Sequence, residues 1–184
     1  MKFHTLICIL VVTAVGQSCA HAQEARPKPP SQLNGKSITI TYTETRRAKP
    51  EEGGEIATRK VPFKLIVYAS TEGNLFNRLF AGRSGKSSDQ TRGTKDGTQF
   101  SERDIVFDKQ KMTVSNTFHS GKGLRTIEAT FDEAFAKCTA SVVTTIQGEY
   151  AKRRLITGGH ELVYSATASE ISCKLVSGNE LQTN

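Results

Sequence analysis

Alternation of apolar and polar residues is the feature that most restricts how this chain can fold. In residues 36–44, KSITITYTE, the apolar residues Ile38, Ile40 and Tyr42 occupy every second position, and threonines stand between them. A strand turns successive side chains to opposite faces, so a period of two with β-branched residues predicts a strand with one buried face. A helix would instead need apolar residues three and four positions apart.

The same period recurs along most of the 184-residue chain. Further strands are expected in residues 61–70, 75–80, 104–108, 111–118, 124–131, 138–146, 161–168 and 170–176. Polar turns separate most of these segments, and DEAFAKC, residues 132–138, is the only stretch with helical character. About eight short strands predict an all-β domain: an antiparallel meander, closed as a small barrel or folded as a sandwich, with at most one short helix.

Two features of this domain bear on its function. The connections from Arg46 to Arg59 and from Gly82 to Gly97 are long for a compact domain, and such loops are either functional or disordered. Five large apolar side chains are expected on inward faces: Tyr42, Phe63, Leu65, Val114 and Phe131. If they fill the interior, the loops must carry the function, whereas a hollow interior would offer a ligand site.

The strand pattern resembles the lipocalin-like and avidin-like small barrels in outline. LNGKSITITYTET, residues 33–45, stands roughly where those families begin their first strand. Their usual tryptophan after a glycine is missing here, and the chain contains no tryptophan. The resemblance implies a module that binds small apolar molecules in its interior or inhibits other proteins through its loops.

The N-terminus has the three parts of a secretory signal peptide. Lys2 gives a positive start, residues 6–12 are an unbroken apolar run, and Ala20-His21-Ala22 is a small-residue cleavage site. A membrane anchor would need about 20 apolar residues, and polar residues interrupt the run from Gln17 onward. Cleavage is expected after Ala22, with Ala20 as the second choice, and the short start with one lysine indicates a bacterial periplasmic or secreted protein.

The remaining chain has the size of one domain. The expected organisation is a signal peptide at residues 1–22, a Pro-rich extended leader at 23–34, a single β domain at 35–178 and a C-terminal tail at 179–184. Without Lys2, 24 basic residues face 18 acidic ones, a net charge of +6. The expected partner is an anionic or small apolar ligand, or another exported protein, and nucleic acid is not expected outside the cell. The mature chain has no second long apolar stretch, so no transmembrane segment is expected in it.

Two cysteines outlast the signal peptide, Cys138 and Cys173. Each stands at an apolar position of its expected strand, and an oxidising compartment favours pairing. A redox couple or a metal site is the alternative, but the chain has no C-x-x-C motif. We therefore expect a buried structural disulfide, which stabilises the fold by about 4 kcal/mol on the chain-entropy model.

A basic loop follows the strand at residues 75–80. Its Gly85-Lys86-Ser87 matches the end of a nucleotide-binding loop, but Phe80 stands where that motif needs its first glycine. What remains is a flexible basic segment that can dock anions through its cations. The candidate binding residues are Arg78, Arg83, Lys86, Arg92 and Lys95.

The sequence offers no catalytic motif. His119 and His160 each stand next to a glycine-containing turn, without a second histidine at ligand spacing, and there is no G-x-S-x-G or S-x-x-K. No catalytic residue, metal or cofactor is therefore expected. The sequence favours a non-catalytic binding or inhibitory module of unknown ligand, and the alternative is a secreted hydrolase whose active site is dispersed over distant strands.

Overall fold

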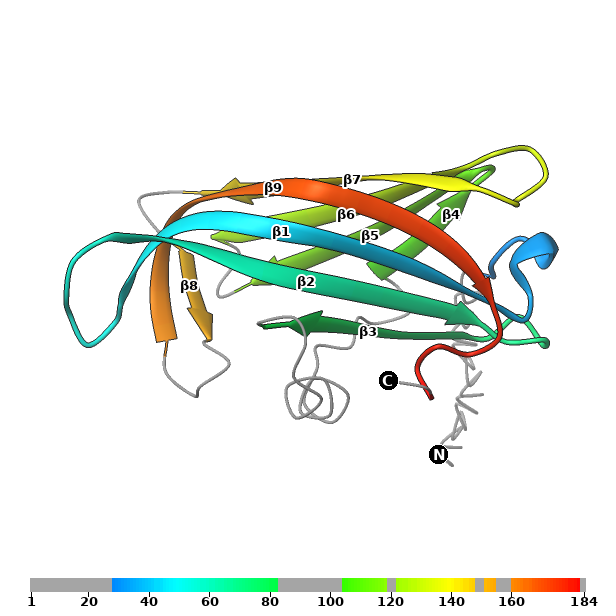
Figure 1. Ribbon diagram of the computed structural model, residues 1–184, viewed down its shortest axis with the longest axis horizontal. Helices are drawn as coiled ribbons and strands as arrows, with labels where there is room; N and C mark the ends of the chain where they lie inside the picture. Colours follow the sequence, from blue (N-terminus) through cyan, green and yellow to red (C-terminus); the bar gives the residue numbers. More distant parts are fainter. Residues whose placement is uncertain (1–27, 83–103, 119–121, 148–150, 155–159, 183–184) are drawn as a thin grey trace, which may run out of the picture.

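The computed structural model describes residues 28–82, 104–118, 122–147, 151–154 and 160–182 (Figure 1). Among these residues, one 3-10 turn, Ser31–Leu33, precedes nine strands. The strands are β1 (Lys36–Pro50), β2 (Ala57–Ala69), β3 (Leu75–Ala81), β4 (Ile105–Asp108), β5 (Lys111–Phe118), β6 (Gly123–Phe131), β7 (Cys138–Ile146), β8 (Ala151–Arg154) and β9 (His160–Ser177). The predicted all-β class is confirmed.

The strands form two antiparallel sheets that face each other as a sandwich. One sheet has the order β3-β2-β1-β9-β8, and the other has the order β4-β5-β6-β7. The chain meanders within each sheet, and β9 then returns to pair with β1, so the first strand lies between β2 and the last strand (Figure 1). Of the two predicted architectures, the described residues adopt the sandwich, because the two ladders remain separate.

Apolar side chains fill most of the space between the sheets. The five residues predicted to face inward are all buried in one cluster: Tyr42, Phe63, Leu65, Val114 and Phe131. Leu33, from the 3-10 turn, is fully buried in the same cluster. Burying each large apolar side chain contributes about 1.5–3 kcal/mol. Apolar side chains therefore occupy this part of the interior.

The first hairpin is longer than its sequence suggests. The ladder between β1 and β2 continues through Arg46↔Arg59 to Ala48↔Ala57. The expected long connection from Arg46 to Arg59 is therefore wrong, and only residues 51–56 join the strands. The charged residues of this segment suggested a loop, but the ladder pairs backbone N–H and C=O groups and does not depend on whether the side chains are charged.

Residues expected to form two strands are one continuous strand, β9. Its register against β1 shifts twice, between Thr41 and Thr43 and between Arg47 and Ala48. At the first shift Glu170 has a φ of 54°, and Thr43 Oγ1 donates a hydrogen bond of 2.7 Å to its carboxylate. Each bulge adds one residue to β9 and reverses which side chains face inward.

The parity of β9 was predicted correctly except beyond the second register shift, at residues 160–164. Ile171 and Cys173 pack against the core as expected. Leu162 and Tyr164 were expected inward, but Val163 is the fully buried residue there. The second register shift explains the difference, since it changes the inward positions from even to odd.

The segment with helical character, residues 132–138, is a turn. The Asp132 carboxylate accepts hydrogen bonds from the backbone N–H groups of Ala136 at 2.7 Å and Lys137 at 3.0 Å. Phe135 has a φ of 50°, and Phe131 pairs with Cys138 across the hairpin. No helix forms here, in agreement with the prediction of at most one short helix, because the aspartate side chain bonds the local backbone in place of a helical turn.

The C-terminal end of the domain packs on β1. Ser37 donates a hydrogen bond to the Gly178 carbonyl at 2.7 Å and accepts one from the Glu180 N–H at 3.0 Å.

A search of the described ranges found no helix that combines the length and the apolar character needed to cross a bilayer.

Candidate functional site

The inward face of β1 changes from apolar to charged along its length. Ile40 and Tyr42 are followed at the same parity by Glu44 and Arg46. Glu44 is fully buried, and Arg46 is 7% exposed. Burying a charge is costly unless it is paired, so the partners of these two side chains decide what this end of the sandwich can do.

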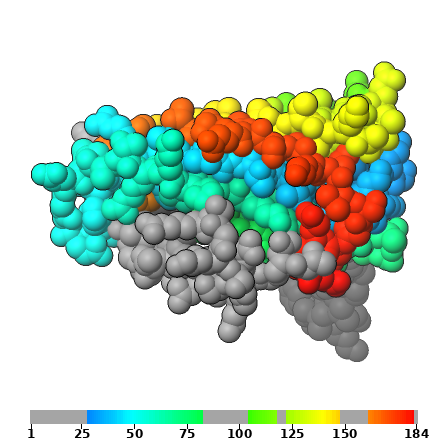
Figure 2. Space-filling model, viewed as in Figure 1, coloured from blue at the N-terminus to red at the C-terminus, as the bar shows by residue number. Residues whose placement is uncertain are grey.

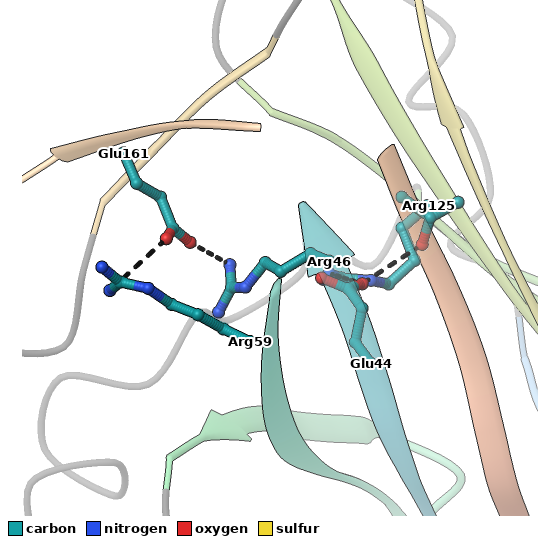
Figure 3. A network of polar contacts seen from close by, with 6 residues as sticks. Glu44, Arg46, Arg59, Arg125 and Glu161 are labelled. Atoms are coloured by element: carbon teal, nitrogen blue, oxygen red, sulfur yellow. Dashed lines mark hydrogen bonds and ion pairs between the residues drawn. The ribbon is translucent and has the colours of Figure 1, made fainter. Parts of the chain in front are cut away.

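Glu44 is paired across the sandwich with Arg125 of β6. The Arg125 guanidinium donates a hydrogen bond of 2.7 Å to Glu44 Oε2, and Thr144 Oγ1 of β7 donates another at 3.3 Å (Figure 3). The Arg125 side chain is 2% exposed, and its guanidinium lies 4.7 Å from the centre of the Phe63 ring. Cation–π contact of this kind adds to the ion pair in a desolvated site.

Arg46 is paired within its own sheet with Glu161 of β9. Their nearest atoms, Nη1 and Oε1, are 2.5 Å apart, and Arg59 Nη1 of β2 lies 4.0 Å from Glu161 Oε2 (Figure 3). The Glu161 side chain is 1% exposed, but that of Arg59 is 42% exposed. These five residues, Glu44, Arg46, Arg59, Arg125 and Glu161, form a charge network that leads from the surface to the sandwich interior.

Burial dominates the electrostatics of the charge network. It raises the pKa of Glu161 above its ordinary value, although Arg46 and Arg59 act in the opposite direction and Glu44 adds a smaller increase. Burial also lowers the pKa of Arg46, against the opposing effect of Glu161. The pKa of Tyr42 is raised by burial despite the nearby Arg125.

The charge network leaves hydrogen-bonding capacity unused. Within the described part of the chain, three buried donors have no acceptor: Tyr42 OH, Arg46 Nε and Arg125 Nε. Both Glu161 oxygens lie close to cations but make no hydrogen bond of acceptable geometry. The charge network has three guanidinium groups and two carboxylates, so its net charge is positive and it has more hydrogen-bond donors than acceptors. Such an arrangement can bind the oxygens of an anion.

The residues predicted to bind are not part of the charge network. Arg78 lies on β3 and pairs with Ile66, between the Tyr68–Phe76 and Lys64–Phe80 pairs. Its side chain is half-buried on the outer face of the sheet, because the inward positions of β3 are Leu75, Asn77 and Leu79. The other four predicted residues, Arg83, Lys86, Arg92 and Lys95, lie outside the described residues.

Sequence reasoning missed the charge network, although one signal was present. Glu44 and Arg46 continue the alternation of Ile38, Ile40 and Tyr42, so their inward position followed from the strand pattern. The partner of Glu44, Arg125, is 81 residues away in sequence, and no local pattern connects the two.

The predicted disulfide is confirmed. Cys138 of β7 and Cys173 of β9 are bonded, with Cα atoms 5.6 Å apart, and the bond joins the two sheets. Both cysteines are half-buried and pack against the core, so the bond is less buried than expected.

The remaining chemistry of the chain offers no second candidate centre in the described residues. They contain no group of three or more metal-ligating side chains. His119 lies outside the described residues, and the side chain of His160 is not described. Comparisons with protein-family models, with curated proteins and with solved structures find no match for this chain.

Proposed function

We propose that this protein is an exported, non-catalytic binding module that holds a small organic anion at the charge network. The observation that carries the proposal is the set of buried donors without acceptors: Tyr42 OH, Arg46 Nε and Arg125 Nε. An unsatisfied buried donor costs about 1–3 kcal/mol, and a carboxylate or phosphate oxygen would remove that cost.

The composition of the site favours an anion over other ligands. Guanidinium groups match carboxylates and phosphates in a planar, two-point geometry, and they remain charged when buried. Arg59, which is 42% exposed, extends the positive charge to the surface, where a ligand would first meet it. A small apolar ligand in the interior is not favoured, because apolar side chains already fill the space next to Tyr42.

Stability alone is a weak explanation for the charge network. Replacing buried ion pairs by apolar residues of similar volume is often neutral or stabilising, since desolvation consumes the Coulombic gain. Arg125 and Glu44 therefore need not be kept for stability, and binding is a reason for charge at this position.

Two observations support export. The first residues carry the three parts of a signal peptide, and disulfides such as Cys138–Cys173 persist in oxidising compartments. The periplasm or the medium is therefore the proposed location.

Calorimetry with small anions tests the binding proposal. The probes are citrate, gluconate and inorganic phosphate, each added to the mature protein. At least one is expected to bind saturably, and the double variant Arg46→Met/Glu161→Gln is expected to lose that binding. The double change removes both charges together, so that neither is left buried alone. Arg47→Met is the control, because Arg47 is exposed on the opposite face of β1.

The outcome separates the proposal from a purely structural network. Failure of all three probes to bind the wild-type protein would refute it, and so would binding that the double variant retains. Loss of binding in Arg47→Met to the same extent would also count against the assigned site.

A hydrolase is the second candidate, and one observation favours it. Glu161 is a buried carboxyl with a raised pKa, and the second carboxylate of the charge network, Glu44, adds a smaller increase to that pKa. A carboxyl with a raised pKa holds its proton to higher pH and is better suited to act as a general acid. Turnover of an ester or glycoside substrate that Glu161→Gln abolishes would favour the enzyme over the binding module.

A further inference from the structure

A shallow depression of about 410 Å³ lies on the protein surface away from the charge network. It is bordered by the residues before β1, the turn between β4 and β5, and the turn between β6 and β7. Figure 1 shows these segments at the end of the sandwich opposite the β1–β2 hairpin. The side chains that matter for recognition are Lys28, Gln32, Phe107, Lys109, Gln110 and Phe135.

The walls of the depression are held by the fold. Phe135 is buried, and its ring stacks on that of Phe131 with centroids 5.4 Å apart. The Lys36 ammonium donates a hydrogen bond of 3.1 Å to the Phe135 carbonyl, and the Gln110 carbonyl accepts one of 2.8 Å from the Phe131 N–H. The turns therefore have fixed positions, so little ordering is needed when a ligand binds.

The backbone at two lining residues is in the left-handed region. Lys109 has a φ of 51° and Phe135 has a φ of 50°. Such conformations cost energy for residues other than glycine, and they persist where the surrounding structure imposes them. Lys109 is the first residue of a two-residue hairpin turn, in which a positive φ is required, and its side chain is exposed at the mouth of the depression.

Three kinds of group meet in this depression. The ammonium groups of Lys28 and Lys109 can pair with a carboxylate. The side-chain amides of Gln32 and Gln110 can both donate to and accept from hydroxyl groups. Phe107 is half-buried and offers an aromatic ring to the apolar face of a ligand.

We propose that the depression binds a uronic acid residue, an acidic sugar, either free or within an acidic polysaccharide. Only a ligand that has a carboxylate, several hydroxyls and an apolar ring face uses all three kinds of group. Inorganic phosphate would leave the amides and the ring unused, and a neutral sugar would leave the lysines unused. The volume falls within the range of small-ligand sites, and the open shape admits a residue within a longer chain.

This site goes beyond the proposed function and is independent of it. It shares no residue with the charge network, and it would take its ligand through lysines and amides rather than through buried arginines. The two proposals can therefore fail separately.

Calorimetry with acidic and neutral sugars tests the site. Hexagalacturonate should bind the mature protein, and the monomer galacturonate should bind more weakly if a polysaccharide is the ligand. Equal affinity per sugar residue would identify the free acid as the source. Lys28→Gln and Lys109→Asn should each weaken binding about fivefold, since each removes one exposed ion pair. Asparagine is chosen at position 109 because it tolerates a positive φ.

Three further variants separate this site from general electrostatics. Phe107→Leu keeps most of the volume but removes the ring, and it should weaken hexagalacturonate binding while leaving any polyphosphate binding unchanged. Lys174→Gln, on the exposed face of β9, removes a positive charge elsewhere and should have no effect. The double variant Arg46→Met/Glu161→Gln should bind hexagalacturonate as the wild type does.

Several results would overturn the inference. These are failure of hexagalacturonate and galacturonate to bind, equal binding of the neutral hexasaccharide cellohexaose, or an unchanged affinity in Lys28→Gln and Lys109→Asn. An equal loss in Lys174→Gln would show a diffuse attraction to a basic surface instead of a site.

Discussion

Glu161 is 1% exposed and lies close to two guanidinium groups, yet its pKa is higher than the ordinary value of 4.5. The cause is burial, which penalises the ionised carboxylate more than Arg46 and Arg59 can compensate. At this residue the folded chain therefore holds the proton more tightly than the unfolded chain does. Stability should consequently depend on pH in a direction opposite to that of an ordinary paired carboxylate.

The pH dependence of unfolding tests this reading of Glu161. The folded chain binds the proton more tightly than the unfolded chain, so the free energy of unfolding should fall as pH rises from 4.5 through the raised pKa. Glu161→Gln cannot titrate and should lack this fall. Urea denaturation from pH 4 to 8 should show the wild type losing stability relative to the variant by up to about 1.4 kcal/mol per pH unit.

The control for this measurement is Glu128→Gln, which removes a carboxylate from the half-exposed ion pair with Lys111. If the difference in the free energy of unfolding between the wild type and Glu161→Gln stays constant from pH 4 to 8, Glu161 has the same pKa in the folded and unfolded chains. That result would contradict the prediction.

At the scale of elements, the bulge at Glu170 sets which face of β9 meets the core. Ala168 packs inward on one side of the bulge, and Ile171 and Cys173 pack inward on the other. Without the extra residue, the alternation from Ala168 would place Cys173 on the outer face. The bulge is thus the condition for the bond between β9 and β7.

Deleting Glu170 should therefore prevent the disulfide. The deletion shifts the register by one residue and turns the side chains of Ile171, Cys173 and Leu175 away from the core, or else it breaks the pairing with β1. Thiol titration of the denatured, unreduced protein should find two free thiols in the deletion variant and none in the wild type. Glu170→Gly, which keeps the residue count and tolerates the positive φ, should retain the bond, and a bonded deletion variant would contradict this account.

The sequence predicted those elements whose evidence is local. The period of two identified the strands, and parity placed Cys138 and Cys173 on inward faces, because a strand exposes its pattern in a few adjacent residues. The change of parity between Ala168 and Ile171 was also visible and indicates the bulge. The pairing of Glu44 with Arg125 was not predictable, since it depends on how two sheets stack, which one sequence does not reveal.

At the scale of the whole molecule, the two sheets are joined by packing and by one covalent bond. β7 and β9 lie side by side at the margin where the sheets meet, and Cys138–Cys173 connects them there (Figure 1). Figure 2 shows the same margin from outside, where β7 in yellow adjoins β9 in orange-red. The bond restricts the unfolded chain by closing a loop between residues 35 positions apart.

Removing the disulfide should destabilise the domain without changing its ligand chemistry. Cys138→Ala/Cys173→Ala should lower the free energy of unfolding by about 4 kcal/mol on the chain-entropy model, and the melting temperature should fall on the order of 10 °C. Calorimetric melting of the variant and of the reduced wild type should give similar decreases. Anion binding measured below the melting transition should be retained, because neither cysteine belongs to the charge network. An unchanged melting temperature would contradict a stabilising role for the disulfide.

The pairing of β1 with β9 has a consequence for the order of events during synthesis. Lys36 lies opposite Ser177, so the central ladder joins the two ends of the domain. Contacts between residues so distant in sequence form slowly, because the intervening chain must first be closed into a loop. Until residues 160–177 leave the ribosome, one edge of β1 is unpaired and β9 does not yet cover its part of the interior. The proposed export would benefit from this delay if the chain crosses the membrane unfolded, because the sheet around β1 cannot be completed until β9 has been synthesised.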